Sequence, residues 1–301
     1  MMIKGAIFGA GFIGLNFIRY GLDHNYQFSV LDIKDKPKNL SDKVIWIKGD
    51  IINREHTKAV LKNADIAYYF ISQTVPGDIL DDFYELNLNL SSTIHFLNAC
   101  LEMKVKRVVF ISSASVYGNQ KEFPIRESFS TDPISTHGIY KLMSEKFFHL
   151  YKVAHGLDCK IMRLSNPYGP GQDIYGKQGI VAITIGKCMM NETLQVRGDG
   201  SSLRDFIYIG DVMEALNLIS TKQSSEIIFN IGSGIANSIN DLIQLVEKKT
   251  GKTLKINHTI SRAVDIKSSH LDISKAEKEL NFKPGTSLEG GVSKTVEYYL
   301  K

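Results

Sequence analysis

The sequence predicts an α/β protein in which helices cover both faces of a parallel sheet, followed by a smaller mixed α/β lobe. Three observations lead to this prediction. Short apolar runs alternate with amphipathic helical patterns along the first half of the chain. These runs are apolar almost without interruption, which is typical of parallel strands buried on both faces. A glycine-rich segment, GAGFIG at 9–14, follows the first run and opens the first helical pattern, as in the doubly wound sheet of the Rossmann type.

The N-terminal part is expected to contain this sheet and its helices. The expected strands cover residues 3–8, 27–32, 43–48, 65–70, 107–112 and 159–164, and the expected helices cover residues 12–23, 54–62, 81–103 and 137–155. The strand segments are short and mainly apolar, whereas the helical segments carry an apolar stripe at helical spacing. Alternation of strands with helices predicts that the strands run parallel.

The pattern changes after about residue 165. Residues 166–179, NPYGPGQDIYGKQG, are rich in glycine and turn formers and predict a long loop. Beyond it, the patterns predict helices at 179–190, 210–220, 238–250, 272–279 and 287–300, with short strands at 194–197, 227–231 and 254–257. We therefore expect an N-terminal domain at 1–165 and a smaller lobe at 166–301, from which some elements cross back to the first domain.

Composition and charge exclude several classes of protein. The 301 residues have a net charge of +4 without a block of like charges, so no nucleic-acid partner is expected. The three cysteines lie far apart and the histidines form no metal-ligand motif, so neither a disulfide framework nor a metal site is expected. The apolar N-terminus resembles a signal peptide, but its glycines fit a buried strand and turn better. No other run reaches membrane-spanning length, and a cytoplasmic protein with reduced cysteines is expected.

The segment GAGFIG predicts a dinucleotide site. Its glycines let the backbone approach a pyrophosphate, and the free N–H groups of the helix N-terminus favour negative charge. Asp32 lies 18 positions after Gly14, at the end of the next strand, where a carboxylate binds the adenosine ribose hydroxyls and repels a 2′-phosphate. This favours NAD over NADP, although Lys34 lies nearby. The alternative is a tight turn followed by a surface aspartate.

Polar residues also follow later strands, at the edge of the sheet where ligands bind in this fold. Asp50 is placed either to contact an adenine amino group or, equally well, to cap the following helix. Ser113 offers a hydroxyl to a sugar, and Asn166 is expected to face the same crevice. Arg204 and Arg262 lie in separate polar loops. Two such guanidinium groups can converge on a diphosphate, although solvated surface arginines are the simpler interpretation.

Together, these motifs resemble the extended short-chain dehydrogenase/reductase family, and within it the NAD-dependent nucleotide-sugar epimerases typified by UDP-glucose 4-epimerase. The resemblance runs from end to end, because the motifs fall in family order: GAGFIG, the strand ending at Asp32, YELNLNLSST with Tyr84 and Asn87, SSASVYG, LSNPYGPGQ, GDGSSLRDF, FNIGSG, SRAVD and ELNFKPGTSLEGGVSKTVEYY.

The resemblance implies that the N-terminal domain holds NAD and that the smaller lobe holds a nucleotide sugar. The residues implied around NAD are Gly9, Gly11, Phe12, Ile13, Gly14, Asp32, Ile33, Asp50, Ile51, Phe70, Ser72, Asn87 and Lys141. The residues implied around the nucleotide sugar are Ser115, Tyr117, Asn166, Arg204 and Arg262.

The family's catalytic residues are a serine or threonine and a Tyr-x-x-x-Lys motif. Ser113 and Lys141 align with these, but His137 stands where the tyrosine is expected. Tyr140 is no substitute, because it projects roughly 100° away around the helix. A neutral imidazole, with an unperturbed pKa of about 6.5, is a competent general base, and a cationic lysine nearby keeps it neutral.

Three interpretations of this departure stay open. In the first, His137 acts as the acid/base of a working enzyme. In the second, the histidine is structural and Ser113 or another group carries catalysis. In the third, the chain binds NAD and a nucleotide sugar without turnover.

The residues after Ser113 narrow the implied reaction. Family members that eliminate water carry carboxylates there, whereas this chain has Ala114 and Ser115. The sequence therefore favours a nucleotide-sugar 4-epimerase acting on a UDP-hexose through a transient 4-keto sugar, with a 4-keto-sugar reductase or a non-catalytic binding protein as alternatives. Helices 81–103 and 137–155 align with the family's dimer interface, so a homodimer is expected, unless those faces are buried only against the sheet.

Overall fold

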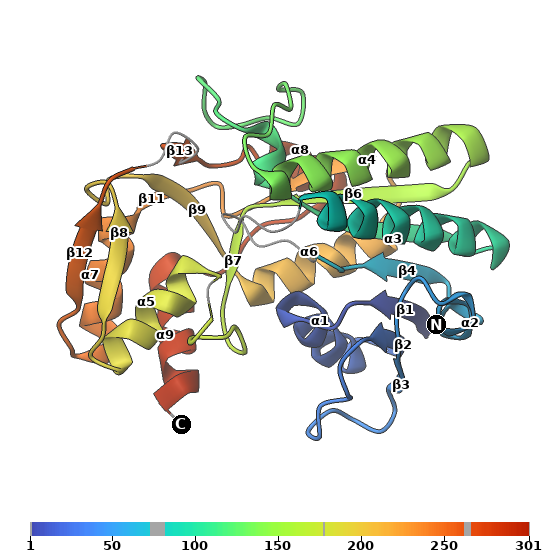
Figure 1. Cartoon of the computed structure of the whole chain (residues 1–301), viewed down its shortest axis with the longest axis horizontal. Coiled ribbons are helices and arrows are strands. Elements are labelled where there is room, and N and C mark those ends of the chain that lie inside the picture. The colour runs from blue at the N-terminus through green and yellow to red at the C-terminus, as the bar shows by residue number, and fades with distance from the viewer. Residues whose placement is uncertain (1, 73–81, 177, 262–265, 301) are drawn as a thin grey trace.

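The computed structural model describes residues 2–72, 82–176, 178–261 and 266–300, of which 82–87 are described as helical backbone only. A seven-stranded sheet forms the centre of the larger lobe (Figure 1), and all neighbouring strands in it are parallel. In spatial order its strands are β3 (Ile45–Lys48), β2 (Tyr26–Asp32), β1 (Ile3–Phe8), β4 (Ile66–Tyr69), β5 (Arg107–Ser113), β6 (Asp158–Leu164) and β10 (Ile228–Ile231). The strand order reverses between β1 and β4, so a ligand crevice is expected at their carboxyl ends.

Helices cover both faces of this sheet, which confirms the predicted fold class. One face packs against α1 (Phe12–Leu22), α6 (Ile209–Thr221) and α8 (Ser274–Leu280), and the other packs against α2 (Arg54–Leu61), α3 (Asp82–Glu102) and α4 (Thr136–His155). Side chains alternate along β1, with Ile7 in the first apolar cluster and Phe8 in the second. Phe8 is fully buried against Phe96 of α3, and burial of such a side chain stabilises the fold by about 1.5–3 kcal/mol.

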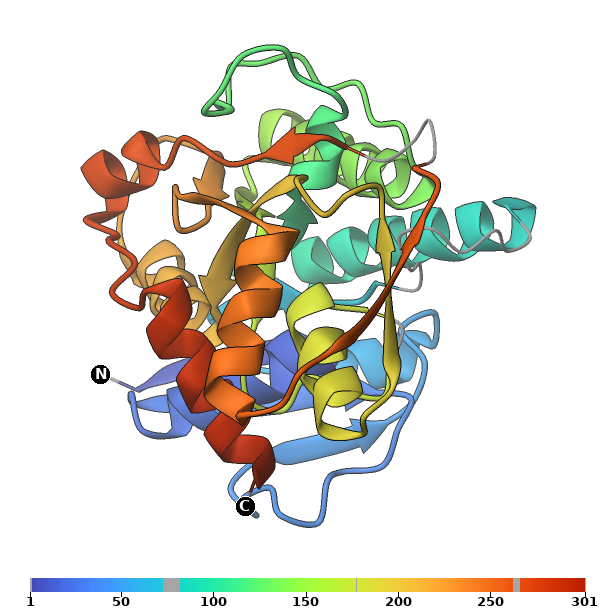
Figure 2. The ribbon, with the colours of Figure 1, turned by 90° about the vertical axis from the view of Figure 1, so that its left-hand side faces the viewer.

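In the described part of the chain, the smaller lobe contains short strands packed beside helices (Figure 2). Its buried side chains form an apolar cluster of their own. Strand β9 (Leu203–Tyr208) pairs with β7 (Asn166–Tyr168), β11 (Ala236–Ser238) and β13 (Ser268–Ser269), and β8 (Thr193–Arg197) pairs with β12 (Lys255–Thr259). The helices are α5 (Ile180–Met189), α7 (Ile239–Thr250) and α9 (Leu288–Leu300).

Two local predictions were wrong. Residues 166–179 are not a continuous loop, because β7 occupies their first three positions, and the patterns gave no sign of β9, β11 or β13. The missed strands have two to six residues. Most of them are too short for the spacing of apolar residues to distinguish a strand from a loop. The strand pairing that stabilises them comes from distant parts of the chain.

Elements from beyond residue 165 cross back to the larger lobe. β10 forms an edge of the large sheet, and α6 packs beside α1. Arg107, at the start of β5, ties the end of α6 to the sheet by donating to the carbonyls of Ile219, Ser220 and Lys222 at 2.7–3.1 Å while it pairs with Asp158 at 2.7 Å. A cation near the C-terminus of a helix is favourable there. The boundary at 165/166 therefore divides the sequence rather than two separate bodies.

None of the helices in the described parts of the chain is long and apolar enough to cross a bilayer. Within the same residues, no group of three or more potential metal ligands comes together.

Candidate active site

The turn between β1 and α1 leaves space where a dinucleotide phosphate is expected. Gly9 has a φ of +93°, which favours glycine. A Cβ on Gly14 would lie 2.4 Å from the carbonyl oxygen of Gly9, so the turn closes tightly. A Cβ on Gly11, the N-cap of α1, would meet no atom within 4 Å. The free N–H groups of the first turn of α1, which includes Phe12 and Ile13, therefore border open space that a pyrophosphate can fill.

The carboxylate of Asp32 is fastened to this turn. One oxygen accepts a hydrogen bond from the N–H of Ala10 at 2.6 Å, and the other accepts one from the N–H of Lys34 at 2.8 Å. Each carboxylate oxygen can accept a second hydrogen bond. Asp32 is half-buried at the end of β2, so its position fits a contact with ribose hydroxyls.

Other predicted cofactor contacts lie on the same edge of the sheet. Ile33 is 70% exposed, and Asp50 is exposed while Ile51 is buried. Asp50 accepts a hydrogen bond from Ile52 at 3.1 Å, but Asn53 is the residue whose side chain caps α2. The alternative that Asp50 caps this helix is therefore wrong, and its contact with adenine stays a prediction.

Three further predicted contacts follow β4 or lie in α3. Phe70 is half-buried and contacts the first turn of α1, since a Cβ on Gly14 would lie 3.4 Å from its ring. Ser72 is exposed. Asn87 lies in the segment that is described as backbone only, so its side chain is outside the described part of the structure.

Ser113 lies at the carboxyl end of β5, where a short 3-10 helix, η1 (Ala114–Tyr117), begins. Its hydroxyl oxygen accepts hydrogen bonds from the N–H and the hydroxyl of Ser115 at 3.1 and 2.9 Å. Both serines are half-buried. The turn therefore presents two hydroxyls, and no carboxylate occurs in η1.

The first turn of α4 packs directly on η1. Ser135 caps α4 by accepting a hydrogen bond from the N–H of Gly138 at 3.2 Å. A Cβ on Gly138 would lie 2.6 Å from the carbonyl oxygen of Ser115, so a larger residue would push the helix away. His137 is half-buried in this turn, and Lys141 follows one turn later. The structure thus brings the three predicted catalytic residues to one end of β5.

Lys141 is buried beside the end of β5. Its ammonium group donates to the carbonyl of Ile111 at 2.8 Å and lies 5.0 Å from the centre of the Phe110 ring. Burial lowers the pKa of Lys141 to about 8, while the carboxylate of Glu145 raises it. A narrow space beside the ammonium group is lined by Tyr69, Ile71, Ser72, Asn89, Phe110, Tyr140, Lys141 and Ser144.

A buried ion pair behind Lys141 was missed by sequence reasoning. Glu145 lies one turn after Lys141 and pairs with Arg163 of β6 at 2.7 Å. Two signals were available in the sequence. Arg163 lies between apolar residues near the carboxyl end of a predicted strand, and Glu145 continues the helical stripe of His137 and Lys141 at intervals of four residues.

The prediction that Tyr117 contacts the substrate is not supported by its position. Tyr117 is completely buried. Its hydroxyl donates to the side-chain oxygen of Asn230 at 2.6 Å, and the guanidinium group of Arg163 lies 4.7 Å from its ring centre. No surface of Tyr117 is left for a ligand, so its role is to hold η1 against β10.

Asn166 and Arg204, two other predicted nucleotide-sugar contacts, come from neighbouring strands of the smaller lobe. The side-chain amide of Asn166 in β7 donates to the carbonyl of Asp205 in β9 at 2.9 Å. Arg204 in β9 is half-buried, and one of its guanidinium nitrogens donates to the carbonyl of Leu203 at 2.8 Å. Arg262 lies outside the described residues.

Asp205 is a second buried charge that the sequence did not point to. Its carboxylate accepts hydrogen bonds from the N–H groups of Ser233, Gly234 and Leu271 at 2.7–3.2 Å. Burial raises the pKa of Asp205, and these hydrogen bonds lower it. The carboxylate thereby ties the strand that carries Arg204 to two segments from elsewhere in the chain.

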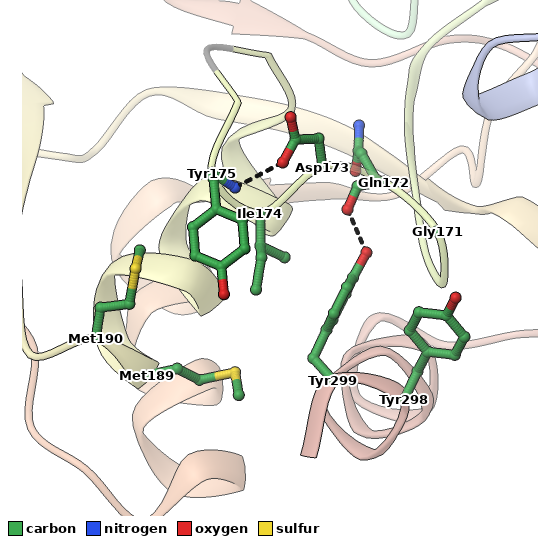
Figure 3. Close-up of a pocket in the computed structure, with 9 residues that line it drawn as sticks. All are labelled: Gly171, Gln172, Asp173, Ile174, Tyr175, Met189, Met190, Tyr298 and Tyr299. Atoms are coloured by element: carbon green, nitrogen blue, oxygen red, sulfur yellow. Dashed lines mark hydrogen bonds between the residues drawn. The ribbon is translucent and has the colours of Figure 1, made fainter. Parts of the chain in front are cut away.

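A cavity of about 450 Å³ opens away from these residues, between the segment after β7 and the ends of α5 and α9 (Figure 3). The hydroxyl of Tyr299 donates to the carbonyl of Gln172, and the N–H of Tyr175 donates to Asp173 at 2.9 Å. The residues that line the cavity are Gly171, Gln172, Asp173, Ile174, Tyr175, Met189, Met190, Tyr298 and Tyr299. No cationic side chain is among them, so this cavity does not suit a diphosphate.

The residues at the carboxyl ends of β1, β2 and β5 fit a dinucleotide. The space at Gly11 suits a pyrophosphate, and Asp32 suits the adenosine ribose. An ammonium group at Lys141 and two hydroxyls at Ser113 and Ser115 are suited to hold a reacting alcohol and to move its proton. The arrangement therefore supports chemistry at a hydroxyl-bearing carbon next to a bound cofactor.

Comparison with known proteins agrees with this arrangement. The model of the NAD-dependent epimerase/dehydratase family matches residues 6–232. The chain belongs to this family, whose members are NAD-dependent nucleotide-sugar epimerases, dehydratases and reductases. The predicted cofactor is the one that the family uses.

Individual relatives are similar along nearly the whole chain. A UDP-glucose 4-epimerase of Mycolicibacterium smegmatis is 28% identical over 308 residues, which cover 99% of this chain and 97% of the relative. A dTDP-4-dehydro-6-deoxyglucose reductase of Escherichia coli is 29% identical over 308 residues, covering 96% and 95%. The crystal structure of UDP-glucose 4-epimerase from Thermotoga maritima with UDP-glucose superposes with a TM-score of 0.92 at 29% identity, and 99% of each chain is covered.

Proposed function

We propose that this protein is a nucleotide-sugar 4-epimerase that acts on a UDP-hexose through a transient 4-keto sugar. The arrangement at the end of β5 carries the proposal. Ser113, the first turn of α4 with His137, and the Lys141 ammonium group meet there, while η1 has no carboxylate that could serve in elimination of water.

NAD supplies reversible hydride exchange with C4 of the sugar when it is bound. The chain's own residues hold it and handle the proton. We propose that the turn at Gly9–Gly14 and Asp32 bind the pyrophosphate and the ribose. We propose that Lys141, whose ammonium group lies at the end of β5, would hydrogen-bond the second ribose and that its positive charge would favour the neutral imidazole of His137.

His137 is proposed to take the proton of the sugar 4-hydroxyl and to return it after the sugar has turned over. Imidazole titrates near neutral pH, so it needs no activation to act as a base. The hydroxyl of Ser113 is proposed to bind the same sugar oxygen. A histidine at this position can then serve where relatives of this kind are expected to use tyrosine.

The nucleotide half of the substrate is proposed to lie against the smaller lobe. Asn166 and Arg204 come from adjacent strands, and Arg262 is proposed to join them at the diphosphate. Guanidinium groups match the oxygens of a diphosphate in geometry and charge. The similarity to a structure that contains UDP-glucose supports UDP as the nucleotide.

A 4-keto-sugar reductase is the second candidate, because the reductase of Escherichia coli is as similar in sequence as the epimerase relatives are. The two differ in their use of cofactor. An epimerase returns its hydride to the product, whereas a reductase consumes one reduced cofactor for each turnover.

The purified protein should therefore be incubated with UDP-glucose, UDP-N-acetylglucosamine and UDP-glucuronate, without added cofactor. NMR would follow the anomeric and H4 signals of the products. We expect conversion of one of these sugars into its 4-epimer. Consumption of added reduced cofactor with a 4-keto sugar, and no epimer, would instead assign a reductase. Thermal stabilisation by the sugar nucleotides without either reaction would assign a binding protein.

We also propose a homodimer formed through α3 and α4. Ile139, Leu150 and Val153 of α4 are 49%, 52% and 71% exposed. Positions 139 and 150 are about three helical turns apart, so these side chains form one apolar stripe. This exposure supports a face that a second copy covers, rather than one buried only against the sheet.

We further propose a cytoplasmic location. The three cysteines, Cys100, Cys159 and Cys188, are free and buried, as is usual for proteins in a reducing compartment. Cell fractionation with an antibody against the chain would test this.

A further inference from the structure

We propose that the buried ion pair of Glu145 and Arg163 is a positioning unit of the active site. It fixes α4 against the ends of β5 and β6, and it keeps a negative charge beside the ammonium group of Lys141. The inference rests on the proposed function to the extent that Lys141 takes part in turnover.

The pair is shielded from water and well aligned. The side chains of Glu145 and Arg163 are 3% and 5% exposed. Two parallel hydrogen bonds join them, from Nη2 to Oε2 at 2.7 Å and from Nε to Oε1 at 3.0 Å. Ser112 donates a further hydrogen bond to Oε1 of Glu145. The geometry is that of a bidentate guanidinium–carboxylate pair, which defines orientation as well as distance.

The pair joins the elements that carry the catalytic residues. Glu145 lies one turn after Lys141 on α4, and Ser112 directly precedes Ser113 on β5. Arg163 comes from β6, so the carboxylate holds one helix against two strands. A change in this contact therefore alters the distance between the Lys141 ammonium group and the Ser113 hydroxyl.

The same network extends to the edge strand β10 of the large sheet. Arg163 lies over the ring of Tyr117 in η1, and Tyr117 donates to Asn230 in β10. The side-chain amide of Asn230 donates in turn to the carbonyls of Ile125 and Asp272 at 2.9 and 3.3 Å. The turn that carries Ser113 is thus fixed from both sides.

Stability alone does not explain an ion pair at this place. Well-packed apolar residues of similar volume are often as stable as a buried ion pair, or more stable. A buried pair beside a catalytic group is therefore expected to serve orientation and charge. This expectation is specific to Glu145, because its carboxylate is the charged group whose effect on Lys141 opposes that of burial.

Few other titratable groups face Lys141. On α4 they are Glu145, His137 one turn earlier, and Tyr140 in the wall of the same narrow space. From β6 there is Arg163, and from β4 there is Tyr69, whose pKa burial raises to about 12. The described residues of β5 and α3 around this space, Phe110 and Asn89, do not titrate. An alkaline limb in the pH profile of kcat would therefore report on Lys141.

The test is the pH profile of kcat in the NAD-loaded protein. Because removal of one partner of a buried pair leaves an uncompensated charge, Glu145→Gln is compared with Glu145→Gln/Arg163→Gln, in which two neutral amides replace the ions. The matched control is Asp158→Asn, which breaks the Arg107–Asp158 pair at the opposite ends of β5 and β6. We expect the alkaline limb of the double variant to move to lower pH by about one unit, and that of the control to stay in place.

An unshifted alkaline limb in the folded double variant would overturn the inference and leave the pair as a purely structural contact. A direct measurement of the pKa of Lys141 distinguishes this result from failure of the proposed function. The ammonium group of Lys141 is titrated by NMR in protein labelled with ¹⁵N-lysine, with the resonance assigned by its loss in Lys141→Met. A lower midpoint in the double variant supports the inference even if no sugar is turned over, and an equal midpoint contradicts it.

Discussion

Lys141 is a residue of the candidate site whose chemistry the fold changes strongly. In water a lysine is charged up to pH values near 10.4, but burial beside Phe110 and the carbonyl of Ile111 lowers the pKa of Lys141 to about 8. The folded protein then binds this proton less tightly than the unfolded chain does. Because the charged form of Lys141 is only moderately stable in this site, the charge of a neighbouring ligand can change its protonation.

The free energy of unfolding should therefore rise with pH between about 8 and 10.5. In this range the unfolded chain holds the Lys141 proton and the folded protein has lost it, so stability increases with pH. The contribution is roughly 3 kcal/mol in total, from a shift of about two and a half units at 1.36 kcal/mol each. Urea denaturation at several pH values should show this rise in the wild type relative to Lys141→Met. If the free energy of unfolding depended on pH in the same way in both proteins, the low pKa assigned to Lys141 would be contradicted.

The sequence predicted which residues meet at the site better than it predicted their contacts. Ser113, His137 and Lys141 could be placed together because a strand end and a helical spacing determine their positions. Tyr117 could not be judged, since its burial depends on Arg163 and Asn230 from distant strands. Glu145 was overlooked although it continues the helical stripe of His137 and Lys141. Asp205 was overlooked because a charged residue in a polar segment looks the same whether it is buried or exposed.

At the scale of the element, the glycines in the turn between β1 and α1 have different roles. Gly14 is required for closure of the turn, because a Cβ there would meet the carbonyl of Gly9 at 2.4 Å. Gly11 has no such neighbour, so its missing side chain leaves room for a ligand. A single substitution at each position can separate folding from cofactor binding.

Gly11→Ala should lose bound dinucleotide and keep its fold. The cost in stability is expected to be below about 1 kcal/mol, since only the capping preference of the position changes. Gly14→Ala should lose about 1–3 kcal/mol or more through overpacking. Absorbance of the released nucleotide and thermal unfolding measure the two effects. Retention of NAD by Gly11→Ala at the wild-type level would contradict the proposed position of the pyrophosphate.

The contact between α4 and η1 depends on Gly138 in the same way. Gly138→Ala adds a Cβ 2.6 Å from the carbonyl oxygen of Ser115, so the first turn of α4 must move away from the Ser113 hydroxyl. A displacement of about 1 Å between reacting groups costs up to about 100-fold in kcat. Copurified NAD should change little, because the β1–α1 turn is untouched. Equal kcat values for the variant and the wild type would show that this contact does not position the catalytic residues.

At the scale of the whole molecule, the doubly wound sheet was predictable because its strands are mainly apolar runs that alternate with amphipathic helices. The smaller lobe was less predictable. Strands β7, β9, β11 and β13 form only because segments far apart in the sequence pair with one another, and Asp205 holds those segments together through its buried carboxylate. Local patterns contain no information on such pairing.

The proposed dimer gives a prediction at this scale. Leu150→Glu/Val153→Glu places two charges on the exposed apolar stripe of α4 and should convert a dimer into a monomer. Ile256→Glu, in the exposed strand β12, is the matched control and should leave the dimer intact. Light scattering after size-exclusion chromatography measures the mass of each protein. A wild-type mass of about one chain would exclude the dimer.

The rate of sugar epimerisation by His137 variants tests the central claim most directly, namely that a histidine does the acid/base work in this site. The substrate is the UDP-hexose that the wild type converts, and NAD content is measured in each preparation. His137→Phe should lose about 10²–10⁴-fold in kcat, the usual contribution of a general acid/base, whereas His137→Tyr should keep a rate within about tenfold of the wild type. A His137→Phe protein that carries NAD and turns over at the wild-type rate would contradict the claim.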